Sequence, residues 1–338
     1  MPIANYGVLA AHPVDRRRED PHSDDSPHYQ IHLVDENGVH YRAAVNVLSQ
    51  EAPSELLYAA IDDFRHPVLD PLPARAVGWM PLPSRPGGAS LDFVRGNLFD
   101  PAVMRALPPD LPGVDNDLAD MLDHHVERAM ADPESVVYLW GEPWGPENQP
   151  DKIFGFAPGG GVHNIHMNQG NSAEFRGDDG VWQDGGVVVR LPGEYRWVAF
   201  FLAFQSQSWH TDDTSGHALP SVPPGPTPTD GAVPVRIVAA LVNPVGPAPE
   251  AEKVMLLNAS PDPVDLGGWH LADRVKRTQP LPDVAVAPGD LLVVDVQPPV
   301  QLSNQGGIIT LLDGADLKVH GVSYSSDEAR REGWTLTF

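Results

Sequence analysis

The chain has 338 residues and carries 46 acidic against 22 basic side chains, a formal net charge of −24. Because phosphate recognition usually needs a basic surface, this acidic excess argues against direct nucleic-acid binding without divalent ions. Cysteine is absent, which excludes thiol nucleophiles, thiolate zinc sites and disulfides.

A β-hairpin is the first element that the sequence predicts. Two β-prone runs, residues 29–34 and 40–47, flank a turn that contains Asn37 and Gly38, two residues that tolerate the positive φ of hairpin turns. Ser54 is then expected to cap a short helix that extends to residue 64, because the apolar residues there recur with helical spacing. The same spacing predicts a second helix over residues 116–131.

Strands are predicted for most of the remaining N-terminal part. Apolar β-prone runs occupy residues 90–94, 135–140, 186–191 and 197–204, and the last two are joined by a Pro-Gly-Glu turn at residues 192–194. The N-terminal domain, residues 1–217, is therefore expected to be α+β with strands dominating.

Six prolines between residues 218 and 234 predict a semi-rigid extended linker, since proline fixes φ and donates no backbone hydrogen bond. The C-terminal domain, residues 235–338, then shows short apolar runs separated by turns at residues 235–243, 253–258, 291–296, 308–312 and 319–323. About a hundred residues of this pattern predict an all-β sandwich.

Nothing in the chain predicts membrane insertion. The first seven residues lack the charged and apolar regions of a signal peptide. The densest apolar run, residues 197–204, is far shorter than the ~20 residues that a membrane-spanning helix needs. We therefore expect a cytoplasmic protein.

The C-terminal domain resembles lamin-tail domains. The similarity lies in ALVNP at residues 240–244, EKVMLLN at 252–258, VDLGGWHLAD at 264–273 and LSNQGG at 302–307. The resemblance implies an immunoglobulin-like sandwich without catalytic residues. It also implies an accessory module that holds a protein or surface partner and that, in bacteria, is often attached to hydrolases.

The N-terminal domain resembles the bacterial YukJ-like family. The similarity lies in NYGVL at residues 5–9, HYQIH at 28–32, AVNV at 44–47, SELLY at 54–58, HNIHMNQGN at 163–171, WQDGG at 182–186 and FQSQSWHTD at 204–212. Because this family has no established activity, the resemblance implies no reaction, and function has to be argued from the residues.

Polar side chains that could bind a metal concentrate between residues 159 and 217. Imidazole, carboxylate and amide oxygen are the ligands of Zn, Mn and Fe sites that lack thiolate. His210 and Asp212 share one face of an extended backbone. His163 and His166 converge only if the backbone turns, which the three glycines before them permit.

Two functions follow from this cluster, from different classes. In the first, His163, His166 and His210 bind the metal, and Asp184, His210 and Asp212 act in catalysis, with Asp184 as the general base for a metal-bound water. The chain would then be a phosphodiesterase-like, metal-dependent hydrolase with a lamin-tail targeting module. In the second, the cluster is a structural polar network, and the chain is a non-catalytic binding or scaffold protein with two ligand-recognition domains.

Three other features have both a functional and a structural interpretation. A serine triad around Ser206 or Ser208 is a weak alternative, because adjacency in sequence says little about triad geometry. The basic run at residues 16–18 could bind phosphate or be a solvated loop, and the acidic residues beside His124 and His125 suggest a solvated helix face. Four tryptophans could line a sugar-binding cleft or fill the core: Trp140, Trp144, Trp182 and Trp209.

Overall fold

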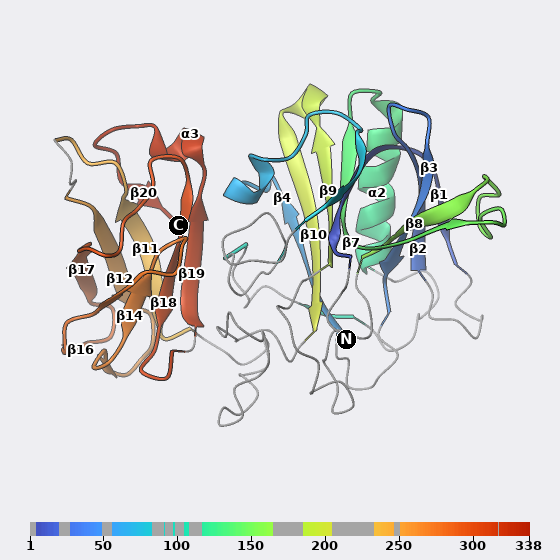
Figure 1. Ribbon diagram of the computed structural model, residues 1–338. Helices are drawn as coiled ribbons and strands as arrows, with labels where there is room; N and C mark the ends of the chain where they lie inside the picture. Colours follow the sequence, from blue (N-terminus) through green and yellow to red (C-terminus); the bar gives the residue numbers. More distant parts are fainter. Residues whose placement is uncertain are drawn as a thin grey trace. The chain divides into compact units, whose positions relative to one another are not determined.

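The computed structural model describes residues 5–19, 28–48, 56–82, 91, 97–98, 105–107, 117–164, 185–204, 233–246, 251–316 and 318–338. Strands dominate this part of the chain (Figure 1). The chain divides into two compact units. The first contains Met1–Phe64, Leu72–Leu91 and Met104–Gln207, and the second contains Arg65–Pro71, Asp92–Val103 and Ser208–Phe338.

A ten-stranded sheet forms the first unit. The order of its strands is β5-β1-β2-β3-β8-β7-β9-β10-β4-β6. Their bounds are Gly7–Arg18 (β1), His28–Val34 (β2), His40–Asn46 (β3), Leu56–Asp62 (β4), Gly78–Pro81 (β5), Arg105–Ala106 (β6), Val136–Glu147 (β7), Gly159–His163 (β8), Gly185–Leu191 (β9) and Arg196–Phe204 (β10).

Five of these strands close into a barrel, because β1 pairs with two different partners along its length. Its first residues pair with β7, and its later residues, from His12 onward and with a register break between Pro13 and Asp15, pair with β2. The ring then continues from β2 to β3, from β3 to β8 and from β8 back to β7. Only the pairing of β3 with β8 is parallel. The interior is filled by buried side chains that include Leu9, Ile31 and Leu139.

The predicted hairpin and second helix are confirmed. Strands β2 and β3 pair over their full length, and Gly38 adopts a positive φ of 77° in the turn. Helix α2 spans Asp117–Ala131 and packs Leu118, Leu122 and Val126 into the same core as the barrel. The predicted strands at residues 135–140, 186–191 and 197–204 are confirmed as β7, β9 and β10.

The short helix expected up to residue 64 is wrong, because residues 56–62 form strand β4. The apolar spacing in this segment is compatible with both a helix and a strand, and sheet pairing decides between the two. Strand β4 pairs with β10 over seven residues, and Leu57, Tyr58 and Ala59 are all buried. Backbone pairing with a long apolar neighbour outweighs a weak local helix preference.

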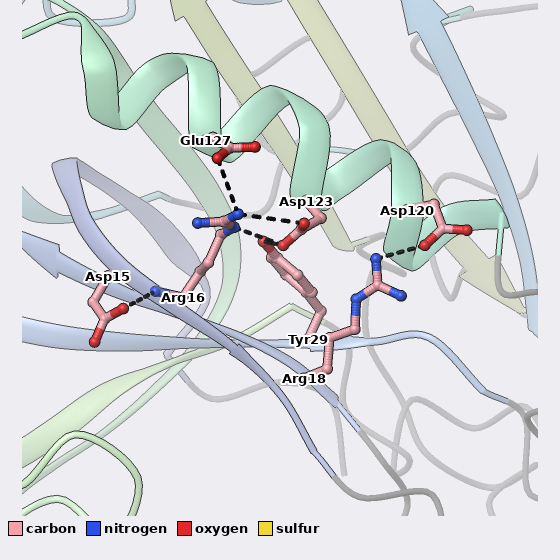
Figure 2. A network of polar contacts seen from close by, with 7 residues as sticks. All are labelled: Asp15, Arg16, Arg18, Tyr29, Asp120, Asp123 and Glu127. Carbon is pink, nitrogen blue, oxygen red and sulfur yellow. Dashed lines mark hydrogen bonds and ion pairs between the residues drawn. The ribbon is translucent and has the colours of Figure 1, made fainter. Parts of the chain in front are cut away.

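The basic run at residues 16–18 lies in strand β1 and not in a loop, and it faces acidic residues of α2. Figure 2 shows Arg16 and Arg18 reaching from β1 to the helix. The Nε atom of Arg16 lies 2.6 Å from Asp123, and Arg18 lies 2.5 Å from Asp120. This acidic face of α2 is therefore ion-paired with the sheet and is not merely solvated.

The second unit has two four-stranded antiparallel sheets. Their orders are β17-β12-β11-β20 and β15-β14-β18-β19. The strands are Val235–Leu241 (β11), Lys253–Asn258 (β12), His270–Ala272 (β14), Thr278–Pro280 (β15), Leu291–Asp295 (β17), Gly307–Leu312 (β18), Lys318–Tyr324 (β19) and Leu336–Thr337 (β20). The five strands that the sequence predicted here are thereby confirmed.

Both sheets contribute to one buried core, with Ile237 and Val254 from the first and Leu271 and Leu311 from the second. A further pair, β13 (Val264–Asp265) with β16 (Ala285–Val286), and the short helix α3 (Ser326–Ala329) complete this unit. Residues 218–232 of the predicted linker lie outside the described residues. Among the described helices, none combines the length and the apolar character required to cross a bilayer.

Candidate functional site

The candidate site is an open pocket on the outer side of the barrel, with a volume of about 450 Å³. Strands β2, β3, β7 and β8 supply most of its wall. The residue after β1 and the β7–β8 connection complete it. The lining residues are Glu19, His28, Gln30, Arg42, Ala44, Trp144, Glu147, Lys152 and His163.

Strand alternation explains why these side chains face outward. Tyr29 and Ile31 of β2 belong to the buried core, and successive side chains of a strand point to opposite faces. His28 and Gln30 therefore face the pocket. The same alternation in β3 buries Ala43 and leaves its neighbours Arg42 and Ala44 in the pocket wall.

Two histidines from different strands meet in the pocket. The Nε2 atoms of His28 and His163 lie 3.0 Å apart. Strand β3 lies between β2 and β8, and its Ala44 is paired with His163. Because the alanine side chain is a single methyl group, the two imidazoles can meet across this strand.

Glu19 holds His28 in place. Its carboxylate accepts hydrogen bonds from His28 Nδ1 at 3.1 Å, from the His28 backbone N–H at 3.0 Å and from Gln30 Nε2 at 2.8 Å. Burial acts to raise the pKa of Glu19, but the hydrogen bonds from His28 and Gln30 outweigh it, so this pKa lies below its ordinary value. Glu19 is therefore an anion at neutral pH.

Arg42 is held on the pocket wall by three contacts. It donates to Asp151 at 2.7 Å and to Gln30 at 3.0 Å, and its guanidinium group lies 4.6 Å from the centre of the Trp144 ring. Trp144 lies close against Gly161, where a Cβ atom would come within 2.5 Å of the ring. Packing and hydrogen bonding thus fix this wall.

The pocket is polar and close to charge balance. Glu19, Glu147 and Asp151 supply three acidic groups at or beside the site, and Arg42 and Lys152 supply two basic ones. Such a mixture of donors and acceptors suits a polar, hydroxyl-rich ligand better than an apolar one or a polyanion.

Of the five residues assigned to the predicted metal-dependent hydrolase site, the structure describes only one. His163 lies in the pocket, whereas His166, Asp184, His210 and Asp212 lie outside the described residues. Within the described ranges, no three His, Asp or Glu side chains gather as a metal-ligand set.

The two described tryptophans of this set lie in different surroundings. Trp140 is fully buried, and Trp144 lines the pocket. Trp182 and Trp209 lie outside the described residues.

Sequence reasoning missed Glu19, His28 and Arg42. The alternation in residues 28–34 could have placed His28 on the outer face. No local signal shows that β3 and β8 pair in parallel, and this pairing is what brings His163 to the same place.

Residues 1–216, which include the whole pocket, match the model of a family described as an uncharacterized conserved protein family, DUF2278. The chain belongs to this family. It is also 44% identical over 215 residues to the "Uncharacterized protein YukJ" of Bacillus subtilis (strain 168), in an alignment that covers 63% of this chain and 93% of YukJ. The YukJ-like resemblance of the N-terminal domain is thereby confirmed.

Proposed function

We propose that the first unit is a non-catalytic binding module for an oligosaccharide, held in the pocket on β2 and β3. The observation that carries the proposal is the connectivity of the barrel. Three consecutive strands form a meander, a helix precedes the fourth strand, and the third strand pairs in parallel with the fifth.

This is the connectivity of the OB-fold. That fold binds oligonucleotides and oligosaccharides on the face of its second and third strands, between the loops that join strands one to two and four to five. The pocket occupies the equivalent face. Its residues come from β2 and β3, from the end of β1 and from the β7–β8 connection. The support is an analogy of fold, so it gives a class of ligand and not a particular one.

Charge favours the oligosaccharide over the oligonucleotide. The chain has a net charge of −24, which opposes the counterion-release binding that drives nucleic-acid affinity. Neutral saccharides need hydroxyl-matching donors and acceptors beside an aromatic ring, and Gln30, Glu19 and Trp144 supply these. The hydrolase stays a prediction, because four of its five residues lie outside the described part of the chain.

Titration calorimetry of the full chain with cellotetraose, chitotetraose and maltotetraose, all in EDTA, tests the proposal. We expect one of these saccharides to bind, and we expect Trp144→Ala and Lys152→Ala to weaken the binding at least tenfold. Lys152 is exposed, so its variant should fold normally. The matched control is Trp334→Ala, at a tryptophan that is 63% exposed in the second unit.

Two results would contradict the proposal. One is saccharide binding whose affinity is unchanged in both Trp144→Ala and Lys152→Ala. The other is tight binding of a single-stranded dT oligonucleotide at low salt in place of all three saccharides, which would assign the pocket to nucleic acid.

For the second unit, we propose a lamin-tail-like, immunoglobulin-like sandwich that tethers the chain to a protein or surface partner in the cytoplasm. Two four-stranded antiparallel sheets around one core support this proposal. The test compares the cellular distribution of the tagged full chain with that of a chain ending at residue 217. The proposal expects a localised full chain and a dispersed shorter one, and identical distributions would contradict it.

A further inference from the structure

The pocket contains a pair of imidazoles whose geometry the proposed saccharide binding does not require. His28 and His163 approach through their Nε2 atoms at 3.0 Å. Their ring centres lie 5.0 Å apart, and their planes cross at 73°. The rings therefore meet by their nitrogen-bearing edges and are not stacked face to face.

The proton of His28 is placed by Glu19. Both oxygens of Glu19 act as acceptors, Oε2 for the backbone N–H of His28 and Oε1 for Gln30, so the Nδ1 atom of His28 donates to Oε2 at 3.1 Å. The Nε2 atom of a neutral His28 then keeps its lone pair, directed at His163. Histidines that bind metals in proteins commonly show this arrangement, with one ring nitrogen on a carboxylate and the other on the metal.

We infer that His28 and His163 bind one Zn²⁺-class transition-metal ion through their Nε2 atoms, with Glu19 orienting His28 from behind. Two imidazole nitrogens on a tetrahedral Zn²⁺, at the usual bond length of about 2.0–2.1 Å, lie roughly 3.3–3.4 Å apart. The observed 3.0 Å differs from this by a few tenths of an ångström, which a small rotation of either ring supplies.

The surroundings suit an open metal site. The pocket leaves room for water or a ligand oxygen to fill the remaining coordination positions. The acidic Glu19, Glu147 and Asp151 outnumber the basic Arg42 and Lys152. With two protein ligands among the described residues, the site should bind metal more weakly than a structural zinc site does.

A second histidine pair, on strands β2 and β3, provides an internal control. The Nε2 atom of His32 lies 2.8 Å from Nδ1 of His40. His32, however, stacks against Phe154 at 5.0 Å and Phe156 at 4.9 Å, instead of donating to a carboxylate as His28 does. Both pairs bring two imidazoles close together. Among the described residues, only the first pair has a carboxylate that is hydrogen-bonded to one of its rings.

The experiment is a calorimetric Zn²⁺ titration of the metal-stripped full chain near neutral pH, without any saccharide. We expect one Zn²⁺ per chain. The His28→Ala and His163→Ala variants should lose this binding, and Glu19→Gln should weaken it about 10- to 100-fold. His40→Ala should retain the wild-type affinity. Nitrogen-15 spectra of the imidazole rings should show Zn²⁺-induced shifts at Nε2 of His28 and His163.

The inference is overturned if no Zn²⁺ binds, if His28→Ala binds as tightly as the wild type, or if His40→Ala loses the affinity instead. Should the alanine variants fail to fold, the spectra of the wild type and the Glu19→Gln titration still decide it. Because saccharide binding is measured in EDTA and Zn²⁺ binding without saccharide, failure of one proposal leaves the other intact.

Discussion

His28 and Tyr29 are neighbours in strand β2, yet their side chains lie on opposite sides of it in very different surroundings. The hydroxyl of Tyr29 donates to Asp123 of α2 at 2.9 Å, and the same carboxylate accepts from Arg16 (Figure 2). His28 also contacts a carboxylate, that of Glu19, but its second nitrogen meets the imidazole of His163 in an open pocket.

From this difference we expect one strand to separate the contacts that stabilise the fold from those that bind a ligand. On the helix side, acidic and basic groups match each other, so these contacts hold α2 against the barrel. On the pocket side, a carboxylate orients the imidazole of His28, whose second nitrogen is directed into the pocket. We therefore expect removal of a polar side chain on the helix side to lower the free energy of unfolding, and removal of one on the pocket side to change ligand or metal affinity.

The largest effect on stability is expected for a substitution that adds an atom to the closely packed wall of the pocket. In Gly161→Ala, the new Cβ would lie 1.9 Å from the carbonyl oxygen of Arg42 and 2.5 Å from the ring of Trp144. Strands β3 and β8 would have to separate, and overpacking of this kind costs about 1–3 kcal/mol. Urea unfolding measures the loss. The neighbouring Gly160→Ala, whose Cβ would meet nothing closer than 3.2 Å, is the matched control, and equal stability of the two variants would contradict the prediction.

A somewhat smaller loss is expected on the helix side. Asp123→Ala removes the acceptor shared by Arg16 and the buried Tyr29, and charged hydrogen bonds that are partly buried contribute about 1–2 kcal/mol. We expect the midpoint of urea unfolding to fall while the Zn²⁺ affinity of the pocket stays unchanged. If Asp123→Ala lowered both the unfolding midpoint and the Zn²⁺ affinity, the two sides of β2 would not be independent of each other.

The pH dependence of stability sharpens the same comparison. Burial raises the pKa of Asp123, but hydrogen bonds from Arg16 and Tyr29 and the positive charge of the arginines outweigh it, so the folded pKa lies below its ordinary value of 3.8. The stabilisation is therefore complete above the unfolded pKa and is lost as the pH falls through the folded pKa. We expect the wild type to have a higher free energy of unfolding than Asp123→Asn at neutral pH. This difference, measured by urea unfolding, should be lost below about pH 3.8. A constant difference across this range would contradict the assignment.

The smallest effect is expected at the exposed end of the same network. Arg18 pairs with Asp120, and their side chains are 42% and 50% exposed. Because solvent screens such pairs, Arg18→Ala should change the free energy of unfolding by no more than about 0.5 kcal/mol. A loss comparable to that of Asp123→Ala, measured by the same urea unfolding, would mean that the network acts as one cooperative unit.

The sequence predicts most of the local structure and only part of the site. The turn at Gly38 and the apolar spacing of α2 are local signals, and both correspond to elements in the structure. The local pattern predicts a helix where strand β4 lies, because its partner, β10, lies more than a hundred residues away in the chain. His163 could be singled out as a candidate ligand, but its contact with His28 spans 135 positions and depends on a parallel pairing that leaves no local pattern.

The double pairing of β1 has a consequence for how the protein folds. Residues 7–11 pair with residues 137–141 of β7, so the barrel closes only when segments about 130 positions apart meet. Closing so long a loop is entropically costly, and folds dominated by such non-local pairing form slowly. During synthesis, β1 leaves the ribosome well before β7 and must therefore wait for it. Until then, the edge of its first half lacks the partner that closes the barrel, although the local β2–β3 hairpin can already form.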